Sequence, residues 1–146
     1  MLDTSGGFMR DKQTVERAKR DLKRGKSPST AAGEFVREEI DHVRQGKHGA
    51  RSPQQAIAIG LSEARRAGIP LKPPAARKTS KNTKDKAKRD YEQGQTSPRL
   101  HKEGSTPRGR ARMKAMKKEP KNSASHSALS RQARSAAKKR KASAGR

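Results

Sequence analysis

Residues 52–68 read SPQQAIAIGLSEARRAG and predict the best-defined helix of the chain. Ser52 is a preferred N-cap residue, Pro53 suits the first helical position, and Gln55 completes a capping box with Ser52. The helix is expected to end at Gly68, shortly before a proline. Apolar residues at helical spacing predict its core-facing stripe, which consists of Ile57, Leu61 and Ala64.

Two further helices are predicted before this one. The first covers residues 11–24, ends before Gly25 and has an apolar face of Val15, Ala18 and Leu22. The second starts at Ser27-Pro28, ends at Gly46 and has an apolar face of Phe35, Val36, Ile40 and Val43. In the third helix, Gly60 leaves room for close approach of a neighbour. Residues 11–71 are therefore expected to form a small three-helix unit.

The rest of the chain is much poorer in apolar side chains. Residues 73–146 hold 23 Lys or Arg against 5 Asp or Glu, and only two of the chain's 15 Leu, Ile, Val and Phe residues. Such a segment lacks the apolar surface that would offset the entropy of ordering. We therefore predict a mostly α protein: a flexible leader (1–10), a small helical domain (11–71) and a long disordered basic C-terminal tail (72–146).

Composition also narrows the possible functions. The chain has no cysteine. Its formal net charge of +24 favours a polyanionic partner. The four histidines show no metal-ligand spacing and are expected at solvated positions, so no metal or cofactor is predicted. Glu38 and Glu39 diverge on a helix and are expected on a solvated acidic face, which argues against a catalytic pair. No enzyme is predicted.

The segment from Glu34-Phe35 through the Gly-Lys loop 46–49 to QAIAIGLSEA (residues 55–64) resembles a family of short basic bacterial and phage-borne proteins of unknown function. That family has a comparable QAIAI-x-LSEA helix. This chain departs from the family pattern at Gln54, where a basic residue is common, and at Gly60, where alanine is usual. The resemblance implies a bacterial-type origin and a small helical domain, and it implies no mechanism.

Two basic segments of the tail resemble DNA-binding peptides. Residues 106–112, TPRGRAR, look like the core of an AT-hook, an extended peptide that lies in the minor groove, although alanine replaces the usual second proline. Residues 123–146 are similar to linker-histone tails. Generic phosphate binding by the same arginines is the alternative to a true hook. The predicted nucleic-acid-binding residues are Arg108, Arg110, Arg112, Lys114, Lys117, Lys118, Arg131, Arg134, Lys138, Lys139, Arg140 and Lys141.

A second basic surface is predicted on the first helix, at Arg17, Lys19, Arg20, Lys23 and Arg24. With three aromatic residues in all, Phe8, Phe35 and Tyr91, the chain cannot build the stacking platforms that single-strand binders use. The sequence therefore favours a non-enzymatic accessory protein that coats or bridges duplex DNA with little sequence specificity. The expected location is cytoplasmic and nucleoid-associated, without a membrane segment. RNA or ribosome association and a protein-docking module on the second and third helices remain open, as does the oligomeric state.

Overall fold

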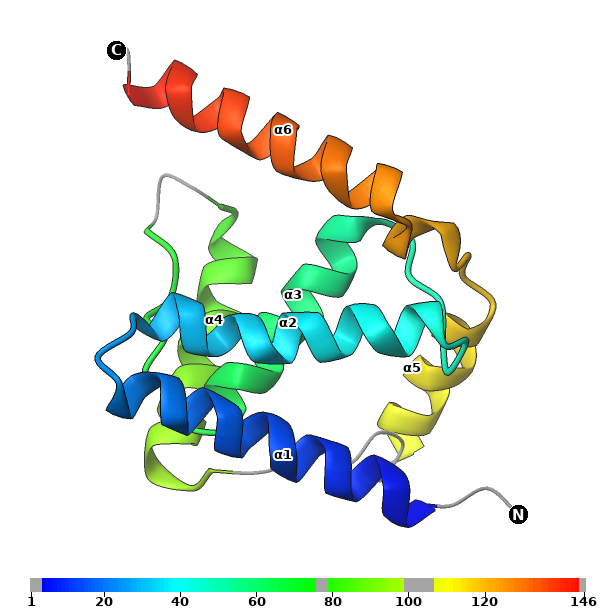
Figure 1. Ribbon diagram of the computed structural model, residues 1–146, viewed down its shortest axis with the longest axis horizontal. Helices are drawn as coiled ribbons and strands as arrows, with labels where there is room; N and C mark the ends of the chain where they lie inside the picture. Colours follow the sequence, from blue (N-terminus) through cyan, green and yellow to red (C-terminus); the bar gives the residue numbers. More distant parts are fainter. Residues whose placement is uncertain (1–3, 76–78, 99–106, 145–146) are drawn as a thin grey trace. The chain divides into compact units, whose positions relative to one another are not determined.

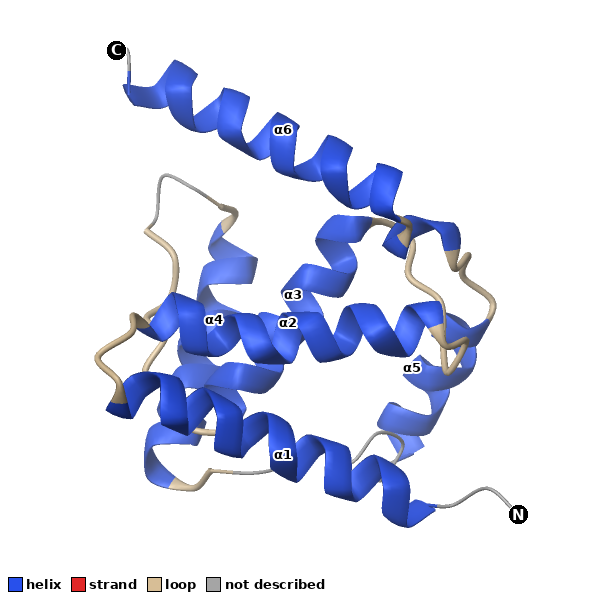
Figure 2. Ribbon diagram, viewed as in Figure 1, coloured by secondary structure: helices blue, strands red, loops and turns tan. Residues whose placement is uncertain are grey.

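The computed structural model describes residues 4–75, 79–98 and 107–144, and for residues 4–11 only the backbone. All regular structure in these ranges is helical (Figures 1 and 2), which confirms the predicted mostly α class. None of the described helices is long and apolar enough to cross a membrane. The elements are α1 (Thr4–Lys23), α2 (Pro28–Arg44), α3 (Pro53–Arg66), α4 (Lys81–Thr96), α5 (Pro107–Lys117), a 3₁₀ turn η1 (Asn122–Ala124) and α6 (His126–Ala144).

The predicted caps define α2 and α3. The Ser27 and Ser52 hydroxyls accept hydrogen bonds from the amides of Thr30 and Gln55, each at 3.2 Å. The Gln55 side chain accepts in turn from the amide of residue 51 at 2.6 Å, one residue before the expected capping-box partner. Helices α1, α2 and α3 each end at a glycine with positive φ, namely Gly25, Gly46 and Gly68. Helix α1 begins at Thr4, inside the leader predicted to be flexible.

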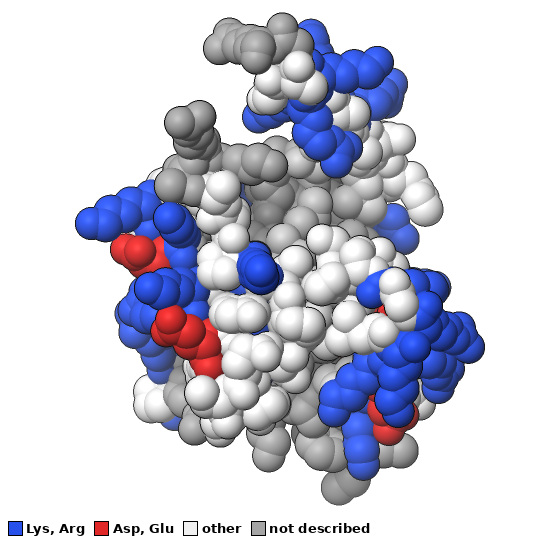
Figure 3. Space-filling model, turned by 90° about the vertical axis from the view of Figure 1, so that its left-hand side faces the viewer, with Lys and Arg blue, Asp and Glu red and all other residues white. Residues whose placement is uncertain are grey.

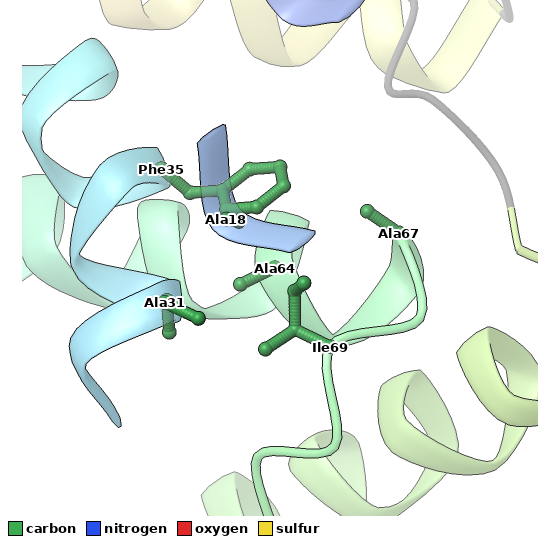
Figure 4. Close-up of a cluster of buried hydrophobic side chains, with 7 residues drawn as sticks. Ala18, Ala31, Phe35, Ala64, Ala67 and Ile69 are labelled. Carbon is green, nitrogen blue, oxygen red and sulfur yellow. The ribbon is translucent and has the colours of Figure 1, made fainter. Parts of the chain in front are cut away.

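The chain divides into two compact units, residues 1–39 with 58–103 and residues 40–57 with 104–146, so that the division passes through α2 and α3. The core of the first unit is formed by α1, α2, α3 and the segment that follows α3 (Figure 4). Its buried members are Ala18, Ala31, Ala32, Phe35, Ala64, Ala67 and Ile69, with Val15, Leu22, Leu61 and Leu71 packed against them. Most of the predicted apolar stripe of α3 is thereby confirmed, whereas Ile57 lies outside this cluster.

Helices α2 and α3 approach each other closely at Gly60. A Cβ placed on Gly60 would lie 2.6 Å from the Cα and 2.8 Å from the amide nitrogen of Val36. Backbone atoms cannot rotate away as a flexible side chain can. The helices therefore pack at a distance that only glycine permits, as the sequence pattern predicts.

We expect Gly60→Ala to destabilise the protein by about 1–3 kcal/mol, because the added methyl group forces the two helix backbones apart. Gly33→Ala is the matched control. Gly33 lies inside α2 with nothing within 4 Å of the added Cβ, so alanine there should stabilise by roughly 0.5–1 kcal/mol. Urea unfolding followed by circular dichroism measures both. Equal effects of the two changes would contradict the close approach.

The second unit has a smaller core. Val43, Ala50, Ala56 and Ala124 are buried, and Ile40 packs against them. The loop after α2 is bound to the last turn of α5 by a backbone hydrogen bond from Gly49 N to Met116 O (2.8 Å), and to the segment after α5 by one from Ala50 N to Pro120 O (3.0 Å). The Ser123 hydroxyl donates to Ala50 O at 2.8 Å. Residues 46–51 and 116–124 thus form one hydrogen-bonded assembly.

The predicted disorder of residues 72–146 is not confirmed, because helices α4, α5 and α6 lie in this range. Helix α4 begins at an N-cap, Ser80, whose hydroxyl accepts from Thr83 N at 3.3 Å. It packs through small residues: Ala87 and Gly94 are buried, and a Cβ on Gly94 would lie 1.7 Å from the carbonyl oxygen of Arg65. A count of large aliphatic residues misses contacts of this kind, in which backbones touch directly.

Candidate nucleic-acid interface

Among the described helices, α5 and α6 carry Lys and Arg without any Asp or Glu, and α6 is the longer of the two. It carries six Lys or Arg, no Asp or Glu, and no buried residue. All six basic side chains are exposed. The C-terminal helix at the top of Figure 3 shows blue side chains with no red among them, whereas red side chains lie among the blue ones elsewhere on this face.

Four of the six basic residues of α6 share one face. Arg131, Arg134, Lys138 and Lys141 follow the spacing i, i+3, i+7, i+10, which at 3.6 residues per turn places them within about 80° of one another. We call these four residues the basic stripe. They lie away from the half-buried positions of the helix, which are Ala128, Leu129, Gln132 and Ala136. The helix therefore presents its positive charge outward as one continuous band.

The start of α6 is fixed by local hydrogen bonds. The Ser125 hydroxyl accepts from Ala128 N at 3.2 Å, and Ser125 O accepts from Leu129 N at 3.0 Å. Just before it, the Arg44 guanidinium donates from Nε to Ala124 O at 2.8 Å. The basic stripe thus starts about two turns after a cap that is connected to the core of the second unit.

Helix α5 contains the segment that resembles an AT-hook. The Pro107–Arg110 segment, PRGR, forms the first turn of this helix, whereas an AT-hook binds as an extended peptide. Its basic residues diverge, since Arg110 lies about 200° from Arg108 around the helix. The predicted residues of this region, Arg108, Arg110, Arg112, Lys114, Lys117 and Lys118, are all exposed. Within α5 they form two groups: Arg108 and Arg112 lie within about 40° of each other, and Arg110, Lys114 and Lys117, spaced i, i+4, i+7, lie within about 60° of one another on the other side of the helix.

The basic face predicted on α1 is also exposed, at Arg17, Lys19, Arg20, Lys23 and Arg24. This face is less uniform than the basic stripe because carboxylates neutralise part of the surrounding charge. Arg17 pairs with Glu34 (Nε to Oε2, 3.2 Å), and Lys26 pairs with Asp21 (Nζ to Oδ1, 3.0 Å).

The two arginines at the end of α3 have structural contacts. Arg66 pairs with the buried Asp90 of α4 at 3.1 Å, and Arg65 donates from Nε to Leu71 O at 3.2 Å. Burial lowers the pKa of the Arg65 guanidinium, and the neighbouring Asp90 carboxylate partly offsets this effect. Both side chains hold elements of the first unit together.

The structure corrects the placement of two histidines and one glutamate. His42, His48 and Glu39, expected at solvated positions, are 8%, 1% and 0% exposed. Their possible metal-ligating atoms lie within 4.8 Å of one another. The Glu39-x-x-His42 spacing puts two of them one turn apart on α2, and this is the signal in the sequence that points to the cluster. The contribution of His48 depends on the course of the loop, which the spacing does not reveal.

Comparison with protein-family models, with curated proteins and with solved structures gave no match. The resemblance to short basic bacterial and phage-borne proteins therefore stays a prediction. Any function has to be argued from the residues themselves.

Proposed function

We propose that this protein is a non-enzymatic accessory protein that binds duplex nucleic acid, DNA in preference, through the basic stripe of α6. The observation that carries the proposal is the arrangement of four exposed basic side chains on one face of a helix without acidic residues. Phosphate groups are the partners that such a surface attracts, since each Lys or Arg contact releases condensed counterions.

The dimensions of the stripe suit a DNA groove. The helix from Arg131 to Lys141 spans eleven residues and rises about 15 Å, and the major groove is about 12 Å wide and admits an α-helix. Arg131 and Arg134 can hold phosphates with two parallel hydrogen bonds, whereas Lys138 and Lys141 act as point charges. Contacts to phosphate position a protein without reading bases. We therefore expect little sequence preference.

The exposed arginines and lysines of α5, together with the basic face of α1, are secondary sites in this proposal. A protein-docking role for α2 and α3 has less support. The large apolar side chains on which it would depend, such as Phe35 and Val43, are buried in the cores of this chain itself.

The proposal predicts steeply salt-dependent binding of the full chain to a labelled duplex of about two helical turns. Each basic residue of α6 is expected to neutralise one phosphate at most. The slope of log K against log salt should then be roughly −3.6 if only the four stripe residues bind, and roughly −5.4 if all six basic residues of α6 bind. Fluorescence anisotropy at several salt concentrations measures the slope. Binding without salt dependence, or none at low salt, would refute the proposal. Stronger binding to an RNA duplex of the same sequence would show that duplex RNA, and not duplex DNA, is the preferred partner.

A further inference from the structure

We propose that Glu39, His42 and His48 bind one divalent transition-metal ion, zinc by preference, and that this ion fixes the loop after α2. Two histidines and one carboxylate are a recurrent zinc ligand set, with water or another donor in the fourth position. All three residues belong to the continuous stretch 39–48, which consists of the last turns of α2 and the loop that follows.

The distances suit a metal ion. Two donor atoms bound to the same tetrahedral zinc lie about 3.3 Å apart, given bond lengths near 2.0–2.2 Å. The donor atoms of Glu39, His42 and His48 are already within 4.8 Å of one another. Small side-chain rotations would therefore complete the site. The rings of His42 and His48 are nearly perpendicular, at 83°, with centroids 6.2 Å apart, so the two imidazoles meet edge to face instead of stacking.

A hydrogen bond orients His48 for this role. Its Nδ1 lies 2.9 Å from the carbonyl oxygen of Gly49. A carbonyl can only accept, so Nδ1 carries the proton, and in the neutral ring Nε2 keeps its lone pair. Metal-binding histidines commonly use one nitrogen for the metal while the other donates to a backbone carbonyl.

The effect of the ion would reach beyond its ligands. His48 directly precedes Gly49, where an added Cβ would lie 1.8 Å from the carbonyl oxygen of Glu119, and whose amide bonds to Met116 O. Fixing His48 to α2 therefore also fixes the contact of residues 46–51 with residues 116–124, the segment that leads into α6. This inference is independent of nucleic-acid binding.

The first test uses full-length, untagged wild-type protein and zinc alone, with long-range ¹H–¹⁵N spectra of the imidazole rings. One equivalent of zinc should shift the ring nitrogens of His42 and His48 and leave the exposed His126 unchanged. The amides of Gly49 and Ala50 should exchange more slowly with zinc bound. No shift, or a shift at other histidines alone, would overturn the proposal.

Variants provide the second test. Zinc at about a hundredfold above its dissociation constant should raise the melting temperature of the wild type by roughly 5 °C or more. His42→Gln and His48→Gln should each abolish this rise, whereas the matched control His126→Gln should retain it. An undiminished rise in both site variants would overturn the proposal. If a variant does not fold without metal, the ring spectra of the wild type decide alone.

Discussion

Phe35→Ala is expected to lower the free energy of unfolding by about 3–5 kcal/mol. Phe35 is 5% exposed, and among the residues whose side chains the structure describes it is the only aromatic member of the first core cluster. Figure 4 shows its ring among Ala18, Ala64 and Ile69. Alanine neighbours have no rotatable side chain with which to fill the space, so most of the cavity would remain. Urea unfolding followed by circular dichroism measures the loss.

Phe35→Leu is the matched control for this prediction. Leucine keeps most of the apolar volume at the same position, and such substitutions usually cost less than about 1.5 kcal/mol. The difference between leucine and alanine thus isolates the cavity. A Phe35→Ala protein that unfolds at the same urea concentration as the wild type would show that the ring is not buried in solution.

The boundaries of α2 and α3 were predictable because they depend on local chemistry. Ser27-Pro28 and Ser52-Pro53 fix the helix starts, and the glycines after α1, α2 and α3 adopt the positive φ that ends a helix. The close approach at Gly60 followed from residue size alone. These features need no knowledge of distant parts of the chain.

Helix α4 and the turn η1 were missed because their packing uses small residues. Gly94 meets the backbone of Arg65, and Ala124 completes a cluster with Val43 and Ala50. Composition rules count large apolar side chains and so underestimate contacts between backbones. The histidine cluster was missed for a different reason, since His48 joins Glu39 and His42 only through the course of a loop.

The basic stripe of α6 was present in the sequence as the spacing of Arg131, Arg134, Lys138 and Lys141. A disordered polycation and a one-sided basic helix have the same composition and net charge. They differ in whether a defined set of charges faces the partner. Pairs of substitutions that remove the same number of charges from different faces of α6 can therefore distinguish the basic helix from the disordered polycation in solution, whereas composition cannot.

Replacing all four stripe residues with glutamine should reduce duplex affinity by about 4 × 10³-fold at 0.1 M salt. Glutamine is a good helix former, so the change removes charge and leaves the helix intact. Each lost phosphate contact costs about eightfold at this salt concentration and makes the slope of log K against log salt shallower by about 0.9. Four lost contacts give about 4 × 10³-fold and a slope change of roughly 3.6. Anisotropy titrations across salt concentrations measure both quantities.

Two double variants in α6 provide the matched comparison. Arg134→Gln with Lys138→Gln removes two charges from the stripe, whereas Lys139→Gln with Arg140→Gln removes two exposed charges that point elsewhere on the same helix. If α6 binds as a helix, the stripe pair should lose about 1.8 from the slope and the off-stripe pair clearly less. If the segment binds as a flexible polycation, the two pairs should lose the same amount. Equal losses would therefore refute the basic stripe while leaving electrostatic binding in place, and no loss in either pair would move the binding surface to α1 or α5.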